Sequence, residues 1–459
     1  MDIVIPLKNI AFRWLYFGQL ISLVGTGLTS IALALLAFDL DPSKAGLILG
    51  SALAVKMIAY LLFAPVVGGY ATYLPRKQWL IGLNIGRAIL VALLPFCDQV
   101  WQFFVLMFLL NAMAAGYTPV YQALLPDVLP DDQEYTRALS LSRLAMEMES
   151  LLSPALAAFF LLFSSYGLLF EINAIAFLGA VMCLLWAKLP QNRLSDHSDG
   201  VWKRVSFGIR SYLKTPRLRA VLLLNLSLSS AGAMIIVNSV VYVRYKLGLS
   251  EEAVPILMLS AGMGAIFAAL SVPKLVERFG DRLIMLVGSS LLSVALLFGL
   301  IEPKYYGLFP LWFLIGFGTS LIMIPTGRVV RYSCRENDRN DYFSANFALT
   351  HAMWLVGYVL AGSLGSYFGL SGAFLGLGLL ALVSTVTAWY LWPTSEKFDL
   401  VHEHPEMEHL HPHIHDEHHQ HEHQGWEGPE PHSHPHYHSK HRHKHKFVID
   451  EHHVQWPKQ

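Results

Sequence analysis

A succession of long apolar stretches is the feature that most constrains how this chain can fold. Up to Trp392, stretches of about 20 mostly apolar residues alternate with short polar segments, and each is long enough to cross a bilayer. Charged residues make up only 14% of the chain against about 25% in soluble domains, too few to cover a water-facing surface. The sequence therefore predicts an all-α membrane protein with twelve spans, near Phe12–Phe38, Ala45–Ala71, Trp79–Pro95, Gln102–Tyr121, Ala138–Phe163, Leu168–Leu189, Val221–Tyr245, Val254–Pro273, Leu283–Leu300, Tyr306–Val329, Tyr342–Tyr367 and Leu370–Trp392.

Lysine and arginine gather in every second connection between these spans. The opposite connections hold little beyond Lys44, Lys246 and Lys304. Because cytoplasmic loops carry the excess of basic residues, both termini and the central loop are predicted to be cytoplasmic. The basic side holds Lys8, Arg13, Arg76, Lys77, Arg137, Lys203, Arg204, Arg210, Lys214, Arg217, Arg219, Lys274, Arg278, Arg282, Arg331, Arg335 and Arg339.

The two halves of the chain repeat each other weakly. An offset of about 207 residues aligns Glu134-Tyr135 with Asp341-Tyr342 and Ala145-Met146 with Ala352-Met353. Each match stands at the start of a span that follows a polar segment. Parallel halves with a substrate site between them are a known transporter architecture. We therefore expect pseudo-symmetric six-helix halves at 1–190 and 220–393, a cytoplasmic linker at 191–219 and a tail at 394–459.

The connection after the eighth span carries a recognisable motif. It reads PKLVERFGDR over residues 273–282, and its acid, arginine, glycine and second basic residue resemble the cytoplasmic signature of the major facilitator superfamily. The copy expected after the second span is degenerate, because Thr72 and Pro75 stand where that family has Asp and Gly. The resemblance implies a gate motif made of Glu277, Arg278, Gly280, Arg282, Arg76 and Lys77, whose charges set loop turns and latch the closed gate.

Two further segments support the same resemblance. The stretch FRWLYFGQLIS from Phe12 to Ser22 resembles the start of drug- and siderophore-exporter branches of the superfamily, as does LLPD over 124–127. The family resemblance covers roughly residues 10–392 and implies a fold rather than a substrate.

Histidine dominates the C-terminal tail. All of the chain's 21 histidines except His197 and His351 lie there, mostly as H-x-H pairs, among residues with little apolar content. Such a composition buries no core, so the tail is predicted to be disordered. In an extended chain residues two apart point the same way, and neutral imidazole suits Ni²⁺, Cu²⁺ and Zn²⁺. The predicted ligands are His402, His404, His409, His411, His413, His415, His418, His419, His421, His423, His432, His434, His436, His438, His441, His443, His445, His452 and His453.

A facilitator-type permease with such a tail is similar to the bacterial nickel-resistance exporters of the Nre/Nrs type. The resemblance implies efflux of Ni²⁺, with Co²⁺ as a second substrate, driven by the proton gradient across a bacterial inner membrane. The tail itself does not choose the metal, because affinities in such a site follow the Irving–Williams order.

Ionisable residues inside the spans are candidates for the transport pathway, because they are costly to hold in lipid. They are Glu147, Glu149, His351 and Lys56. Two residues apart on a helix point about 200° apart, so at most one of the two glutamates is expected to face a cavity, and Lys56 can pair with the other. The alternative is structural: a Glu–Lys salt bridge, and a histidine that hydrogen-bonds a neighbouring helix.

Three functions stay open on the sequence alone. The first is export of a divalent cation, the second is export of an organic molecule such as a siderophore, drug or metal chelate, and the third is a membrane-anchored metal buffer or sensor. No nucleotide-binding glycine loop or nucleophile elbow is present, so an enzyme is not expected. With a net charge of zero, the chain is not expected to bind nucleic acid. We expect a monomer whose partners are lipid, protons and a divalent metal (Ni²⁺, or Co²⁺ or Zn²⁺) that is substrate and tail ligand, with no permanent cofactor.

Overall fold

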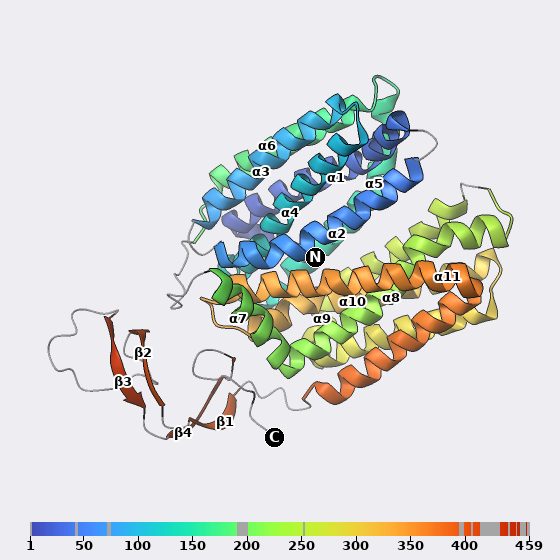
Figure 1. Ribbon diagram of the computed structural model, residues 1–459. Coiled ribbons are helices and arrows are strands. Elements are labelled where there is room, and N and C mark those ends of the chain that lie inside the picture. Colours follow the sequence, from blue (N-terminus) through green and yellow to red (C-terminus); the bar gives the residue numbers. More distant parts are fainter. Residues whose placement is uncertain are drawn as a thin grey trace.

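Two bundles of helices lie side by side in this computed structural model (Figure 1). The structure describes residues 2–41, 45–70, 75–190, 201–250, 253–393, 399–404, 407–413, 432–438, 441–446, 448–449 and 456. Helices dominate because a backbone in lipid has no water to bond with and must satisfy its own N–H and C=O groups. The predicted all-α membrane fold with two six-helix halves is thus confirmed.

The N-terminal half contains six spans after a short 3₁₀ helix. Asn9 caps the first span, since its side chain accepts a hydrogen bond from the backbone N–H of Phe12 at 3.1 Å and donates to the carbonyl of Val128 at 3.1 Å. The elements are η1 (Asp2–Lys8), α1 (Ile10–Leu40), α2 (Ala45–Tyr70), α3 (Arg76–Leu93), η2 (Leu94–Phe96), α4 (Val100–Val128), α5 (Asp132–Leu161) and α6 (Gly167–Trp186).

The C-terminal half contains six spans in four long helices. Gly280 in α9 and Gly369 in α11 have φ of 77° and 70°, a region that residues with a Cβ rarely adopt, so each of these helices turns back there and crosses twice. Nine helices among the described residues are apolar and long enough to span a bilayer; these two divisions and α2, apolar over Ser51–Val67, complete the predicted twelve. The elements are α7 (Val201–Lys214), α8 (Pro216–Val240), η3 (Val241–Lys246), α9 (Ala253–Phe298), η4 (Gly299–Ile301), α10 (Tyr305–Tyr332) and α11 (Arg339–Leu391).

The halves meet mainly along α2 and α5 of the N-terminal half. Helix α2 packs against α11, and α5 packs against α9 and α10. Each half has its own apolar core, which in the C-terminal half is built around Trp312, Tyr342 and Phe374. Many large apolar side chains instead cover the outside of the bundles, as expected of a surface in contact with lipid tails.

The predicted linker contains a helix. Residues 191–200 lie outside the described residues, but α7 follows them and α8 begins at Pro216, four residues before the expected boundary. Helix α7 packs closely on α11: a Cβ at Gly208 would lie 2.7 Å from the carbonyl oxygen of Asp341. The Tyr212 hydroxyl also donates to the side-chain carbonyl of Asn346 at 2.9 Å. Helix α7 therefore packs on the C-terminal half, and it also contacts α2 of the N-terminal half.

The tail departs from the predicted disorder in its described residues, which form four short strands beyond the α7 end of the bundle (Figure 1). The alternation of histidine with other residues is also the period of a β-strand, and backbone pairing needs no apolar core. In the first pair His402 lies opposite His443 and His404 opposite His441. The strands are β1 (Asp399–His404) with β4 (His441–Lys446), and β2 (Met407–His413) with β3 (His432–His438), both pairs antiparallel. The predicted ligands His415, His418, His419, His421, His423, His452 and His453 lie outside the described residues.

Candidate transport pathway and gate

A cavity of about 950 Å³ opens between α5 of the N-terminal half and α8, α9 and α10 of the C-terminal half. Its walls are mainly aliphatic side chains. The polar groups that reach it are Arg143, Glu147, Glu149, Ser150 and Thr319. A volume of this size fits a drug-sized molecule or a hydrated ion.

Arg143 and Glu147 form an ion pair in the wall of this cavity. They stand one helical turn apart on α5, and each side chain is only 13% exposed. The guanidinium of Arg143 also crosses to α10, where its Nε donates to the Ser320 hydroxyl at 3.0 Å and its Nη1 contacts the Met323 sulfur at 3.3 Å. The pair therefore links a carboxylate in the pathway to the contact between the two halves.

Glu149 reaches the same cavity but has different neighbours. The Ser153 hydroxyl donates to its carboxylate at 3.2 Å, and a Cβ at Gly27 of α1 would lie 2.1 Å from that carboxylate. The expectation that only one glutamate faces the cavity is therefore wrong, because both line it. Glu149 lines the cavity although its carboxylate lies against α1, a helix outside the cavity wall.

His351 and Lys56 lie at the other contact between the halves, where α2 meets α11. The ring of Tyr60 meets His351 edge-on at 4.8 Å between centroids, and the Lys56 amine lies 5.6 Å from the centre of the Tyr60 ring. His351 Nδ1 donates to the Phe347 carbonyl at 2.7 Å, because a carbonyl only accepts, so Nε2 keeps its lone pair. Lys56 thus stacks on an aromatic ring of the interface rather than pairing with Glu147 or Glu149 on α5.

The predicted pathway residues therefore fall into two groups on different helices. Within the described residues, no three His, Cys, Asp or Glu side chains gather closely enough to hold a metal ion.

The two halves are tied together at one end of the bundle, which we call the gate end. It carries the α4–α5 connection, the α10–α11 connection and α7. Asp127, at the end of α4, pairs both with Arg76 of α3 and with Arg339 of α11. Arg76 and Arg339 are 5% and 8% exposed, so two cations from opposite halves share one shielded carboxylate.

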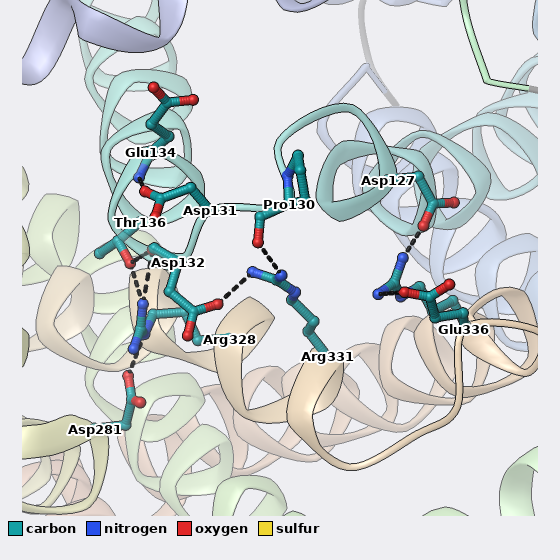
Figure 2. A network of polar contacts seen from close by, with 11 residues as sticks. Asp127, Pro130, Asp131, Asp132, Glu134, Thr136, Asp281, Arg328, Arg331 and Glu336 are labelled. Atoms are coloured by element: carbon teal, nitrogen blue, oxygen red, sulfur yellow. Dashed lines mark hydrogen bonds and ion pairs between the residues drawn. The ribbon is translucent and has the colours of Figure 1, made fainter.

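A second set of ties lies beside the first (Figure 2). Arg331 pairs with Asp132 at 2.7 Å and donates to the carbonyl of Pro130 at 2.6 Å. Arg328 donates to the Asp132 carbonyl at 3.0 Å and to the Thr136 hydroxyl, and it pairs with Asp281 at 2.9 Å. Arginines of α10 thus hold the start of α5, so the gate end is closed.

The intact copy of the motif, at residues 273–282, lies at this gate, and its residues make different contacts. The Glu277 carboxylate accepts from the side-chain amide of Gln133 across the halves at 2.9 Å. Gly280 supplies the turn between the two spans of α9. The guanidinium of Arg278 lies 5.1 Å from the Phe279 ring, and Arg282 donates to the Trp389 carbonyl at 3.2 Å.

In the degenerate copy after the second span, the two basic residues, Arg76 and Lys77, make different contacts. Arg76 joins Asp127, whereas Lys77 donates to the carbonyls of Leu185 and Ala187 at 2.8 and 2.9 Å and thereby caps α6. Thr72 lies outside the described residues.

The sequence did not single out the residues that close the gate. Arg331 and Arg339 entered only the loop-charge comparison, Arg328 did not enter the predicted pathway or gate, and Asp127 stood only in the LLPD resemblance. A usable signal was the placement of acids at the end of the fourth span and the start of the fifth, opposite arginines of the tenth and eleventh.

The opposite end of the bundle has a charged contact within one half. Lys246 pairs with Glu302, whose carboxylate also accepts from the Ser371 hydroxyl. These hydrogen bonds from Lys246 and Ser371 lower the pKa of Glu302 below its ordinary value.

Comparisons with known proteins agree with this architecture. A family model described as Major Facilitator Superfamily matches residues 15–297 and 222–428. Relatives include the uncharacterized MFS-type transporter YvqJ of Bacillus subtilis, 21% identical over 87% of this chain and 97% of the relative, and the multidrug resistance protein MdtG of a Rahnella strain, 26% identical over 72% and 81%. Similar structures, each covering 83% of this chain and 99% of the other, are a bacterial homologue of the iron transporter ferroportin in an outward-facing state (TM-score 0.68, 16% identity) and the human organic anion transporter MFSD10 (TM-score 0.71, 13% identity).

Proposed function

We propose that this chain, which belongs to the Major Facilitator Superfamily, is a secondary active exporter of divalent metal cations, with Ni²⁺ as its leading substrate and Co²⁺ as a second. Members of this family are transporters rather than enzymes. Energy for export would come from a proton gradient, with protons entering as the metal leaves.

The observation that carries the proposal is the histidine-rich tail at the gate end of a transporter. Its strands lie beyond that end of the bundle (Figure 1), where a cytoplasmic ion would enter when the gate opens. Imidazole is a good ligand for Ni²⁺, and many weak sites near the entrance raise the local ion concentration without trapping the ion. A tail of this kind collects substrate, whereas the cavity carries out transport.

Within the cavity, the glutamates have the right charge for a cation. Glu147 has Arg143 as its counter-ion, so an arriving cation or proton competes with that arginine for the carboxylate. Loss of the ion pair frees the Arg143 guanidinium from Glu147 and so changes its contact with Ser320 of α10. Occupancy of the carboxylate is thereby coupled to the interface between the halves, as exchange of a proton for a metal ion requires.

The proposed location is a bacterial inner membrane, with both termini and the gate end in the cytoplasm. The gate end carries Arg76, Arg328, Arg331 and Arg339, which agrees with the excess of Lys and Arg on the cytoplasmic side of membrane proteins. A closed gate at that end leaves the cavity facing outward.

A second candidate is export of an organic molecule. The aliphatic walls of the cavity favour it, because an organic substrate gains more from apolar contact than a metal ion does. The relative from Rahnella is named a multidrug resistance protein, which agrees with this reading.

Growth of a metal-sensitive bacterial host tests the proposal. The full chain is expressed, tolerance to Ni²⁺, Co²⁺, Zn²⁺, Cu²⁺ and a panel of toxic organic cations is scored, and cell-associated metal is counted. Raised nickel tolerance with lowered cell nickel is the expected result. Raised tolerance with raised cell nickel would mean that the tail only sequesters the ion, and tolerance to organic cations alone would establish the second candidate.

A further inference from the structure

Two apolar residues near the end of the chain are buried, unlike those of a free tail. Val448 and Ile449 are 5% and 3% exposed, although they follow the histidine-rich strands. The Tyr342 hydroxyl, itself buried at the start of α11, donates to the backbone carbonyl of Ile449 at 3.0 Å. At Val448 and Ile449 the chain therefore returns to the helical bundle.

A second contact holds the end further along. The ring of Trp456 lies 5.5 Å from the guanidinium of Arg217, at the start of α8. Arg217 is fixed in turn, because it donates to the Ser333 hydroxyl at 2.7 Å and to the Tyr332 carbonyl at 2.8 Å. A cation positioned over an indole is a favourable and specific contact.

The surface that takes this end is closely packed. Phe207 of α7 packs edge-on against Tyr342, with 6.3 Å between ring centroids, and α7 is held on α11 by the close approach of Gly208. We name this surface the tail cradle and define it by Phe207, Arg217 and Tyr342.

We propose that the tail cradle is a docking site for the chain's own C-terminal end, and that docking closes the histidine-rich segment into a loop held beside the gate. The loop begins where α11 ends, and the antiparallel pairing of β1 with β4 brings its two ends together. Such a loop keeps its histidines near the gate, whereas a tail free at one end would spread them through a larger volume.

The position of the cradle ties it to the gate. Tyr342 stands three residues after Arg339, which pairs with Asp127 across the halves, and such residues are neighbours on a helix surface. Arg217 grips the end of α10, the helix that carries Arg328 and Arg331. One cradle residue, Tyr342, therefore stands on a helix that carries a gate arginine, and the other, Arg217, contacts the end of such a helix.

Photo-cross-linking of the full chain in membranes tests the docking. With p-benzoylphenylalanine in place of Trp456, irradiation without added metal should join residue 456 to peptides from 201–219 or 339–346 of the same chain, as mass spectrometry would identify. Ile449→Asp should lower the yield of this cross-link at least tenfold, because burying a carboxylate without a partner is costly. The substitution lies outside the helical bundle and should leave the bundle unchanged.

Tyr342→Phe, which removes only the hydroxyl, should lower the cross-link several-fold. Its matched control is Tyr305→Phe, which removes a similar hydroxyl bond to the Ala253 carbonyl (2.8 Å) away from the tail and should change nothing. Cross-links that are absent, between chains, or unaffected by Ile449→Asp would overturn the docking.

The consequence for transport rests on the proposed function. Ile449→Asp should raise the nickel concentration needed for half-maximal export about threefold and leave the maximal rate unchanged, because the released tail no longer concentrates ions at the gate. An unchanged half-maximal concentration would overturn the held loop's role in supply. The cross-link is measured without metal, so failure of docking is distinguishable from failure of nickel export.

Discussion

The gate end and the cavity wall differ in how far their ion pairs are exposed. At the gate, Arg331 and Arg339 of the C-terminal half meet acids of the N-terminal half in pairs whose members range from 8% to 50% exposed. In the cavity wall, both members of a single pair, Arg143 and Glu147, are only 13% exposed and sit among aliphatic side chains. Partly hydrated pairs exchange partners at low cost, whereas breaking a buried pair leaves an uncompensated charge.

This contrast assigns separate roles to the two regions. The gate is a latch of several modest contacts, which opening must break together. The cavity pair is a single expensive contact, which only a competing ion or proton can release. Substitutions in the cavity should therefore abolish transport, whereas substitutions in the latch should shift the balance between open and closed states.

The largest effect is expected at Glu147. Glu147→Gln removes the carboxylate for which metal and proton would compete and leaves the Arg143 charge without its partner in the cavity wall. Transport should therefore fall about 100-fold, which corresponds to a rise of about 2.7 kcal/mol in the barrier. Transport by the purified chain in vesicles is the measurement. The matched control is Glu171→Gln, at an exposed position on α6, which should retain full transport. Equal transport by the Glu147 variant would remove the distinction between cavity and latch.

A smaller effect is expected at Asp127. Asp127→Asn deprives Arg76 and Arg339 of their shared carboxylate, so the gate should open more often, by about 10-fold. A cysteine at Thr319, which lines the cavity, reports this as faster labelling by an impermeant thiol reagent from the gate end, once Cys97, Cys183 and Cys334 are replaced.

The control for that experiment comes from the other end of the bundle. Glu302→Gln also breaks an ion pair, but one that joins two parts of the same half. Labelling at position 319 from the gate end should not change. An equal increase in the two variants would show that charge loss in general, and not the tie between halves, opens the gate.

A moderate loss of stability is expected at Gly280. Its φ of 77° is costly for alanine, so Gly280→Ala should destabilise the chain by about 1–2 kcal/mol and lower its unfolding temperature. Gly82→Ala is the matched control, since a Cβ there meets no atom within 4 Å. If both variants unfold at the same temperature, the turn does not depend on glycine.

The smallest effect is a pH dependence at Glu302. The pKa of this carboxyl is lowered by Lys246 and Ser371, so its contribution to stability is present above the ordinary pKa of glutamate and is lost as pH falls through the lowered value. The wild-type chain should therefore unfold at a higher temperature than Glu302→Gln at pH 7, with the difference shrinking toward pH 3. A constant difference across this range would contradict the assignment.

Much of the fold followed from the sequence, because bilayer thickness fixes the length of a span and basic loops mark one side of the membrane. The gate was harder to foresee. Arg328 and Asp281 are distant in the chain, and only the packing of α10 on α9 and α5 brings them together with Thr136. Helical periodicity also misled the reading of Glu149, because residues from opposite flanks of α5 both border the cavity.

Nickel transport in inside-out vesicles tests the central claim most directly, namely that metal leaves through this cavity in exchange for protons at Glu147. With an acid interior, vesicles holding the wild-type chain should accumulate Ni²⁺, a protonophore should abolish the accumulation, and Glu147→Gln vesicles should take up about 100-fold less. Accumulation of an organic cation with no nickel, or nickel uptake that survives Glu147→Gln, would contradict the account.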